Sequence, residues 1–374
     1  MTPRMTFVRS ADEFAAIRPA WQDLWARSEG YIFQHHDWIS GWMNGIATRR
    51  EIRTLIVLAW DGDTLIGALP VAIHRRRGLR ILNFAAQLFS DYCDGLLDPL
   101  RDRDIILQAL WQVVMRDGGF DIINLQQVRP DARCRGMLDD LACDARELQL
   151  TEREERCMRI DNQWENGHAF FRSLNKKGRN NHTRGKRILA EIGGEPVFRV
   201  IEGDQDPVPA FDEIWRLKEI WLRATEPTSS LLDNDRFVLR SVLDAAWRTG
   251  LVKVFLMECD GKIAAGSVNF VYANRMEAYF TSYDTRFERA SPGTILIVEY
   301  AQWAFDRGLT HVDFLRGEEA FKFRMANAAT ILSGYSGART LLGQVARSGH
   351  RFLSRRRQVV ETPPAPAAAE LQPV

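Results

Sequence analysis

The residues whose types and spacing could perform chemistry lie between positions 279 and 324. An aromatic segment at 279–283 is typical of a strand, and Asp284 and a polar turn follow it. Ser291, Pro292 and Gly293 then open an apolar segment that is typical of a helix. Ser can cap free backbone N–H groups, Pro presets φ, and Gly lets a ligand come close to the backbone. Because a helix N-terminus also favours anions, this turn predicts a pyrophosphate site, with ordinary helix capping as the alternative.

A second group of polar residues follows the same helix. The helix is predicted to end at Arg307 and Gly308, and a short strand is predicted over residues 311–315. Three residues of flexible or charged character come after that strand: Gly317, Glu319 and Lys322. A strand, an anion-binding helix start, a second strand and a charged loop therefore follow one another.

The order of these motifs resembles the C-terminal half of the FemAB-like branch of the GNAT acyltransferases, which includes the CelD-like proteins of cellulose biosynthesis. The resemblance is carried by Tyr283, Asp284, Ser291, Pro292, Gly293, Asp313, Phe314, Gly317, Phe321 and Lys322. A weaker likeness extends over residues 170–337. The usual GNAT pyrophosphate loop has Arg or Gln, two residues, and then Gly-x-Gly or Gly-x-Ala. Here Ser291 stands at the first Gly, and Glu288 stands at the Arg.

The resemblance implies an acyl-CoA-dependent N-acyltransferase acting on an amino sugar or another cell-envelope or exopolysaccharide precursor. An ammonium group must lose a proton before it can attack a thioester, so the site needs a base or a water relay, and the oxyanion needs a donor. We expect Asp284 to be the base or to orient the amine, with Glu319 as the alternative. Lys322 is expected to hold an anionic group of the acceptor or to stabilise the oxyanion, and Tyr283 to protonate the departing thiolate.

The binding residues expected from the same resemblance fall into two groups. The acyl-CoA, acetyl-CoA or a longer one, is expected to meet Arg286, Arg289, Ser291, Gly293 and Thr294. A basic helix over residues 170–194 is expected to border the acceptor and cofactor site through Arg179 and Arg184, since guanidinium groups bind phosphates in pairs of hydrogen bonds. Asp313 is expected either at the substrate or, more simply, in positioning the loop at Gly317. No metal is expected.

Two halves of the chain share one pattern. Residues 55–74 and 252–272 each read as a β-hairpin around an Asp-Gly turn, and each is followed by a Trp-bearing helix, a Gly and a strand. We therefore predict an α/β fold with two tandem GNAT-like units, at 1–160 and 166–345, followed by a tail at 346–374. Residues 94–104 are acidic where the second half has its Ser-Pro-Gly turn, so the first unit is predicted to be non-catalytic.

Composition excludes several classes of protein. The chain has 374 residues, 45% of them hydrophobic, which suits two globular domains, and a formal net charge of +1, which argues against a DNA-binding protein. Neither a signal peptide nor a membrane span is indicated, so a cytoplasmic protein is expected. The five cysteines form no C-x-x-C pair. Walker A, G-x-G-x-x-G, G-x-S-x-G and H-E-x-x-H motifs are absent from the sequence.

Two further segments invite functional readings. His35 and His36 are adjacent, so they point to different sides, and we interpret them as part of a core helix capped near Asp37. The basic tail could contact a membrane surface weakly or, through Arg351 and Arg355, a cyclic dinucleotide. Two other functions stay open: aminoacyl transfer from charged tRNA, as the FemAB relatives perform it, and a non-enzymatic module that binds a nucleotide or sugar and regulates polysaccharide synthesis.

Overall fold

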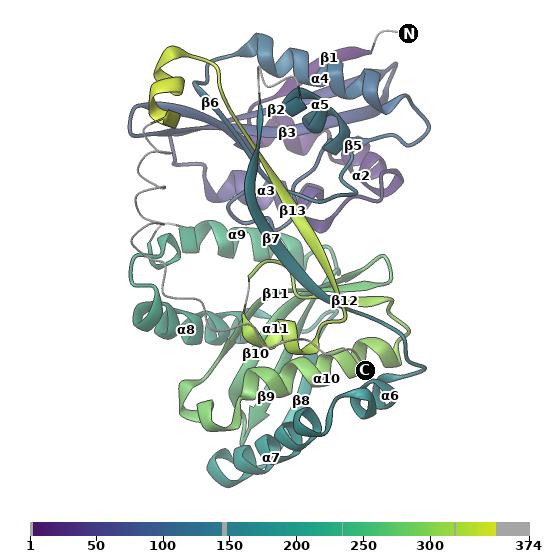
Figure 1. Ribbon diagram of the computed structural model, residues 1–374, viewed down its shortest axis with the longest axis vertical. Helices are drawn as coiled ribbons and strands as arrows, with labels where there is room; N and C mark the ends of the chain where they lie inside the picture. The colour runs from purple at the N-terminus through teal and green to yellow at the C-terminus, as the bar shows by residue number, and fades with distance from the viewer. Residues whose placement is uncertain (1–2, 144–147, 234, 318, 349–374) are drawn as a thin grey trace, which may run out of the picture.

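The N-terminal half of the chain is a mixed α/β unit (Figure 1). The computed structural model describes residues 3–143, 148–233, 235–317 and 319–348. The elements of the first half, in chain order, are β1 (Arg4–Val8), α1 (Ala11–Ala16), α2 (Arg18–Arg27), η1 (Ile32–Gln34), α3 (His36–Gly45), β2 (Ile52–Asp61), β3 (Thr64–Arg76), β4 (Leu79–Phe84), β5 (Leu96–Leu97), α4 (Arg103–Asp117), β6 (Ile122–Val128), α5 (Arg135–Cys143) and β7 (Gln149–Asp161).

The C-terminal half is built on the same plan. Its elements are α6 (Gly167–Ser173), α7 (Lys176–Gly193), β8 (Pro196–Ile201), α8 (Val208–Thr225), η2 (Ser230–Leu232), α9 (Asp235–Trp247), β9 (Val252–Cys259), β10 (Lys262–Tyr272), β11 (Arg275–Tyr283), η3 (Thr285–Ala290), α10 (Pro292–Asp306), β12 (His311–Asp313), α11 (Ala320–Met325) and β13 (Ala328–Ala338). Residues 341–348 are also helical.

The strand order shows that the two halves repeat one unit. The described strands form one sheet in the order β1-β2-β3-β4-β6-β13-β7-β12-β11-β10-β9-β8, with β5 beside β3. Read inward from its two ends, this order is four antiparallel strands and then one parallel pair in each half, β4 with β6 and β11 with β12. The predicted hairpins are β2–β3 and β9–β10. The predicted α/β fold with two GNAT-like units is therefore confirmed.

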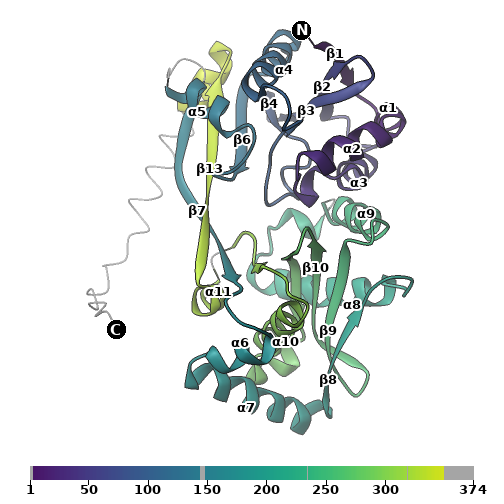
Figure 2. The same cartoon turned by 90° about the vertical axis from the view of Figure 1, so that its right-hand side faces the viewer.

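The two halves exchange a strand at the centre of the sheet. β7 follows α5 of the first half, yet it pairs with β12 of the second half, where Ile160 lies opposite Val312. β13 follows α11 of the second half, yet it pairs with β6 of the first half, where Leu125 lies opposite Tyr335. The two long strands also pair with each other and run side by side through the middle of the molecule (Figures 1 and 2).

The sequence predicted a domain boundary near residues 155–166. The first part of this stretch, as far as Asp161, belongs to strand β7. The domain limits 1–160 and 166–345 stay a prediction. Each half of the sheet pairs with a strand that the other half of the sequence supplies. The predicted tail lies for the most part outside the described residues, and Arg351 and Arg355 are among those outside.

Hydrophobic packing joins the halves directly. Helices α3 and α9 cross so closely that a Cβ on Gly41 would lie 2.8 Å from the carbonyl oxygen of Ser241, and one on Gly45 would lie 2.8 Å from the Cα of Val238. Beside this crossing, Trp38 of α3 packs edge-on against Phe270 of β10 with ring centroids 5.5 Å apart. Aromatic pairs of this kind contribute about 0.5–1.5 kcal/mol beyond the area they bury. The core between the halves is thus continuous.

One local prediction was wrong in detail, and the structure makes a second more specific. The basic segment 170–194 is two helices rather than one, because Asn175 interrupts it and caps α7 by accepting a 2.8 Å hydrogen bond from the Gly178 N–H. The cap of α3 is His35 itself, whose Nδ1 accepts from the Asp37 N–H at 3.2 Å. Asp37 instead forms an ion pair with Arg18. Asn and His side chains can each take the capping role, and sequence alone did not show which residue would do so.

Candidate active site

The parallel pair β11–β12 opens where the predicted catalytic residues begin. Only Met276 and Glu277 of β11 pair with β12, opposite Val312 and Asp313. β11 then continues to Tyr283, so the rest of its edge has no strand partner on that side within the described chain. A β-bulge at Tyr279 marks the start of the unpaired stretch, since the register with β10 shifts there. Bulges re-aim side chains and backbone groups and occur often beside active sites.

The turn between β11 and α10 has the features of an open anion site. Ser291 is exposed, takes a left-handed φ of 54°, and makes no capping hydrogen bond with its side chain. Pro292 occupies the first turn of α10, and Gly293 and Thr294 are half-buried. A Cβ on Gly293 would lie 3.7 Å from the ring of Tyr283, so the last residue of β11 lies beside the helix start.

Asp284 is engaged by a neighbouring arginine. Its buried carboxylate accepts hydrogen bonds from the backbone N–H of Arg286 at 2.9 Å and from the guanidinium of the same residue at 2.5–3.1 Å. Burial raises the pKa of Asp284, but the hydrogen bonds from Arg286 outweigh burial and lower the pKa. A carboxylate with a lowered pKa is a weaker base. Arg289, by contrast, is exposed and has no ion-pair or hydrogen-bond partner among the described residues, so it is the freer of the two candidate phosphate ligands.

Lys322 and Glu319 shape the loop after β12. The buried Lys322 ammonium donates to the Arg316 carbonyl oxygen at 2.6 Å and forms an ion pair with Glu319 at 2.9 Å. Gly317 has a φ of 108°, and a Cβ there would lie 2.5 Å from a carboxylate oxygen of Glu319. Only glycine suits this position, because it needs both the positive φ and the space.

Asp313 links β12 to the first half of the molecule. One carboxylate oxygen accepts from the Leu315 N–H at 2.8 Å and the other from the Tyr92 hydroxyl at 2.8 Å. Arg129 approaches the same oxygen at 3.6 Å. Leu315 itself has a φ of 54°, so Asp313 holds a strained backbone turn at the entrance to the loop of Gly317. Its side chain is buried and fully engaged by protein groups.

Three charged residues beside Lys322 were not identified from the sequence. Arg316 donates to Glu155 of β7 at 2.9 Å, and the charges of Arg316 and Lys322 both act on Asp91, which lies in the loop after β4. Lys218 of α8 lies 4.2 Å from the centre of the Trp221 ring, and burial lowers its pKa. Arg316 directly precedes Gly317 and so belongs to the sequence motif that ends at Lys322. Asp91 and Lys218 belong to segments far from the motif and carry no local signal.

The basic helix α7 packs against the turn that precedes α10. A Cβ on Gly185 would lie 2.6 Å from the Ala290 carbonyl oxygen, so α7 touches the residue before Ser291. Arg179 donates to the carbonyl oxygens of Arg172 and Leu174 and thereby closes the end of α6. Arg184 is exposed, and the described chain provides no carboxylate for it. Of the two arginines predicted at the substrate, Arg184 is therefore the one that is free to bind a ligand.

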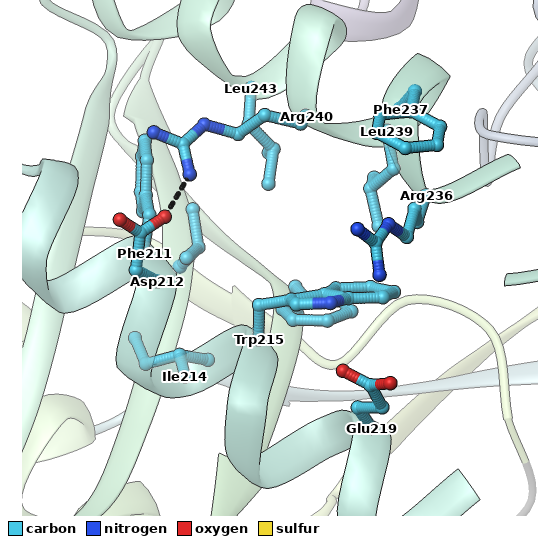
Figure 3. Close-up of a pocket in the computed structure, with 12 residues that line it drawn as sticks. Phe211, Asp212, Ile214, Trp215, Glu219, Arg236, Phe237, Leu239, Arg240 and Leu243 are labelled. Carbon is cyan, nitrogen blue, oxygen red and sulfur yellow. Dashed lines mark hydrogen bonds and ion pairs between the residues drawn. The ribbon is translucent and has the colours of Figure 1, made fainter. Parts of the chain in front are cut away.

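A pocket of about 350 Å³ lies between α8 and α9 (Figure 3). Phe280 of β11 forms part of its wall, so the pocket adjoins the unpaired stretch of that strand. On one side Asp212 and Arg240 form an ion pair, and on the other side Arg236 lies above Trp215. Arg236 has no ion pair within the described part of the chain. The pocket thus combines aromatic walls with one unpaired guanidinium.

Within the described residues neither a metal centre nor a membrane-spanning helix is found. The described residues contain no cluster of three or more His, Cys, Asp or Glu side chains that could hold a metal ion. His36 contacts the Phe14 carbonyl oxygen at 3.1 Å, which accounts for one of the two adjacent histidines within the core. No helix in the described part of the chain combines the length and the apolar character needed to cross a membrane.

Comparisons with known proteins agree with this geometry. Residues 176–323 match the family model of an acetyltransferase (GNAT) domain. FemX has a similar fold, with a TM-score of 0.57 and 10% identity over 90% of this chain and 97% of that chain. The C-terminal DUF2156 domain of a protein described as a lysylphosphatidylglycerol synthetase, from Agrobacterium fabrum, gives a TM-score of 0.53 and 13% identity over 90% of this chain and 96% of that one. No curated protein matches the sequence.

The matched segment runs from the start of α7 into α11 and includes Asp284, Ser291, Gly293 and Lys322. The C-terminal half of the chain therefore contains a GNAT acyltransferase domain. The likeness in fold to FemX extends over nearly the whole of both chains.

Proposed function

We propose that this protein is an acyl-CoA-dependent N-acyltransferase whose acceptor is an amino sugar or a related precursor of the cell envelope or of an exopolysaccharide. The observation that carries the proposal is the Ser291–Pro292–Gly293 start of α10, with Ser291 exposed, which follows η3 and the strand that opens away from β12. The N-terminus of α10 and the free guanidinium of Arg289 would bind the pyrophosphate of the cofactor. The thioester would then lie along the unpaired edge of β11.

In this proposal different side chains around the unpaired edge of β11 perform different steps of the reaction. The Lys322 ammonium uses two of its three N–H groups within the loop, and the third would donate to the oxyanion or to the acceptor. Burial raises the pKa of Tyr283, and the neighbouring Glu288 carboxylate raises it further. Tyr283 therefore stays protonated at neutral pH and would protonate the departing thiolate. Glu319 is half-exposed and paired with Lys322, so it would serve the acceptor more readily than the proton transfer.

The pocket between α8 and α9 supplies a place for the acceptor. Sugar rings bind to aromatic faces, and Trp215 and Phe280 offer such faces in the pocket wall. Arg236 would meet an anionic substituent of the acceptor, because its guanidinium lacks a carboxylate partner within the described chain. Lys218 also approaches Phe280, at 6.0 Å from the ring centre, and so connects the pocket with the loop of Lys322.

The proposal is tested by cofactor binding and its loss. Acetyl-CoA should raise the melting temperature of the protein, because a ligand that binds only the folded state stabilises it by mass action. Gly293→Glu should abolish this rise by adding bulk and negative charge at the half-buried turn. Gly136→Glu is the matched control, since a side chain at that exposed position of α5 would meet nothing within 4 Å. A normal rise in a folded Gly293→Glu protein would remove the turn from the site.

A second candidate function is the transfer of an amino acid from charged tRNA. The exposed cations of α7, Lys176, Lys177 and Arg184, favour it, because a row of such groups beside the active site suits a large polyanionic donor. The fold of the lysylphosphatidylglycerol synthetase domain points in the same direction. Charged tRNA added to the same melting experiment separates the two: stabilisation by tRNA and none by acetyl-CoA would favour aminoacyl transfer.

A further inference from the structure

One loop of the N-terminal half reaches into the candidate active site of the C-terminal half. This loop, residues 85–94, follows β4 and is held by groups from both halves. Tyr279, the bulged residue of β11, donates from its hydroxyl to the Phe89 carbonyl oxygen at 2.7 Å. Two residues after Phe89 comes Asp91, and the next residue, Tyr92, binds Asp313 of β12. The loop therefore lies across the place where β11 and β12 separate.

Further contacts fix the position of this loop. Trp38 donates from its indole N–H to the Ser90 hydroxyl at 3.1 Å, and Gln34 donates to the Tyr92 carbonyl oxygen at 2.9 Å. The Cys93 N–H donates to the Gln127 carbonyl oxygen at 2.9 Å. Residues on both sides of Asp91 are thus held by buried groups, so the position of its carboxylate is set by the fold.

The carboxylate of Asp91 faces charges of both signs. It remains partly exposed to solvent although protein groups enclose it. The titratable groups that interact with it come from β11, from β7, from the segment between β12 and α11, and from its own loop: Tyr279, Glu155, Cys157, Arg316, Lys322 and Cys93. Lys322 and Arg316 are the two cations of this group. Asp284, by contrast, is bound on both carboxylate oxygens by Arg286.

We propose that Asp91, from the N-terminal half, is the general base that takes a proton from the ammonium group of the acceptor in the active site of the C-terminal half. The inference rests on the proposed N-acyltransferase function. The N-terminal half, predicted from sequence to be non-catalytic, then supplies a catalytic residue.

The proton and bond changes follow from this position. The acceptor ammonium gives one proton to the Asp91 carboxylate, and the free amine nitrogen attacks the thioester carbonyl carbon. The C–N bond forms, and the C=O electron pair moves to oxygen. When the oxyanion collapses, the C–S bond breaks and CoA leaves as the thiolate. The nitrogen loses its second proton, the thiolate takes up one, and Asp91 returns its proton to solvent, so the products are the amide, CoA and one released proton.

The acid–base properties of Asp91 suit this role. Burial raises the pKa of its carboxyl group to about 6, against the opposing effect of Arg316 and Lys322. At neutral pH the group is therefore ionised and yet more basic than an ordinary aspartate, as a general base should be. Activity carried by Asp91 should fall as the pH drops through about 6, because the protonated carboxyl cannot accept a proton.

The test uses the full chain, acetyl-CoA as donor and glucosamine as the probe acceptor. Asp91→Asn should lower turnover by roughly 10²–10⁴-fold while the affinity for acetyl-CoA, measured by calorimetry, stays unchanged. The pH profile should change as well. The wild type should show a plateau above pH 6, whereas the Asn variant should gain about tenfold per pH unit, because only the free amine then reacts. A merely structural role of Asp91 would not produce that slope.

Two further variants examine the same carboxylate. Asp91→Glu keeps a carboxylate and should restore the plateau. Glu155→Gln removes a negative neighbour that raises the pKa of Asp91, so the acidic limb of the profile should move to lower pH. If the acidic limb of the pH profile lies at the same pH in Glu155→Gln and in Asp91→Asn as in the wild type, another group produces it. That result overturns the proposal.

A complex with acetyl-CoA gives a measurement that needs no acceptor. In this complex the gap between the Asp91 carboxylate and the thioester carbonyl carbon should be wide enough for one acceptor nitrogen or one water molecule, and no wider. A greater separation overturns the role of Asp91 and leaves the acyltransferase function standing, as does full activity of Asp91→Asn. Failure of the wild type to bind acetyl-CoA at all overturns the proposed function, and the base assignment with it.

Discussion

The hydroxyl of Tyr92 donates a 2.8 Å hydrogen bond to the carboxylate of Asp313, and both side chains are buried. Tyr92 belongs to the loop after β4 and Asp313 ends β12, so this one contact joins the two halves at the candidate active site. The guanidinium of Arg129 lies over the Tyr92 ring, 4.6 Å from its centre, and completes the arrangement. The loop that carries Asp91 is thereby anchored one residue away from the proposed base.

Removing this hydroxyl should destabilise the protein. Tyr92→Phe leaves a buried carboxylate oxygen of Asp313 without its donor, which costs about 1–3 kcal/mol in the free energy of unfolding. Urea denaturation measures the loss. Tyr31→Phe is the control, because the Tyr31 hydroxyl donates at 3.1 Å to the exposed Asp131, and that change should cost less. Equal losses in the two variants would contradict a special role for the buried contact.

The packing of α7 on the turn that precedes α10 predicts opposite effects for two glycines of one helix. Gly185→Ala places a Cβ 2.6 Å from the Ala290 carbonyl oxygen, so α7 must move away from η3, and we expect a loss of about 1–3 kcal/mol together with weaker acetyl-CoA binding. Gly178→Ala meets its nearest neighbour at 3.4 Å and should gain up to about 1 kcal/mol from helix propensity. Thermal unfolding with and without acetyl-CoA measures both. Equal behaviour of the variants would show that α7 does not support the turn.

Lys322→Met should weaken acceptor binding or lower turnover, with acetyl-CoA affinity unchanged, because the lysine contacts the loop after β12 and not the cofactor turn. Steady-state kinetics separate the two possibilities: a higher KM for the acceptor indicates binding, and a lower kcat indicates oxyanion stabilisation. Lys262→Met, in the exposed β9–β10 hairpin, is the control. Unchanged KM and kcat in Lys322→Met would exclude the residue from both roles.

Asp284 now has a structural role that tests its predicted catalytic one. Asp284→Asn removes the charge that binds Arg286 and weakens the cap of η3, so we expect a loss of about 1–2 kcal/mol in stability and less than a tenfold change in turnover. Calorimetry of acetyl-CoA binding, combined with turnover, measures these effects. A 10²–10⁴-fold drop in turnover at unchanged cofactor affinity would return the base role to Asp284 and take it from Asp91.

Acid should destabilise the protein through His35. Burial lowers the pKa of His35 to about 4, whereas an unfolded histidine titrates near 6.5. Between pH 6.5 and 4, His35 is therefore protonated in the unfolded chain but neutral in the folded protein. The free energy of unfolding falls over this range by up to about 3 kcal/mol. His35→Asn keeps a capping group but cannot titrate, and the difference between this variant and the wild type should shrink as the pH falls through that window. Urea unfolding at pH 7, 5.5 and 4.5 measures it. A constant difference would contradict the assignment to His35.

Local sequence features predicted the local structure well. The Asp-Gly turns gave the two hairpins, the Ser291–Pro292–Gly293 signal gave the start of α10, and an acidic segment contained the cap of α4, Asp102. These features depend on contacts between residues close together in the chain. Long-range features could not be predicted: Asp91 and Arg316 interact electrostatically but are far apart in sequence, and no local pattern marks Asp91. The exchange of β7 and β13 was missed for the same reason.

The crossing of β7 and β13 also constrains how the chain can acquire its fold. When the first half leaves the ribosome, β6 has no neighbour on its outer edge, because β13 begins only at Ala328. An unpaired strand edge can pair with other chains, so the newly made N-terminal half is prone to aggregation until β13 has been synthesised. Two identical subunits that exchange their C-terminal strands and are joined into one polypeptide would have the same connectivity. Neither half, cut free at residue 160, would possess a finished sheet.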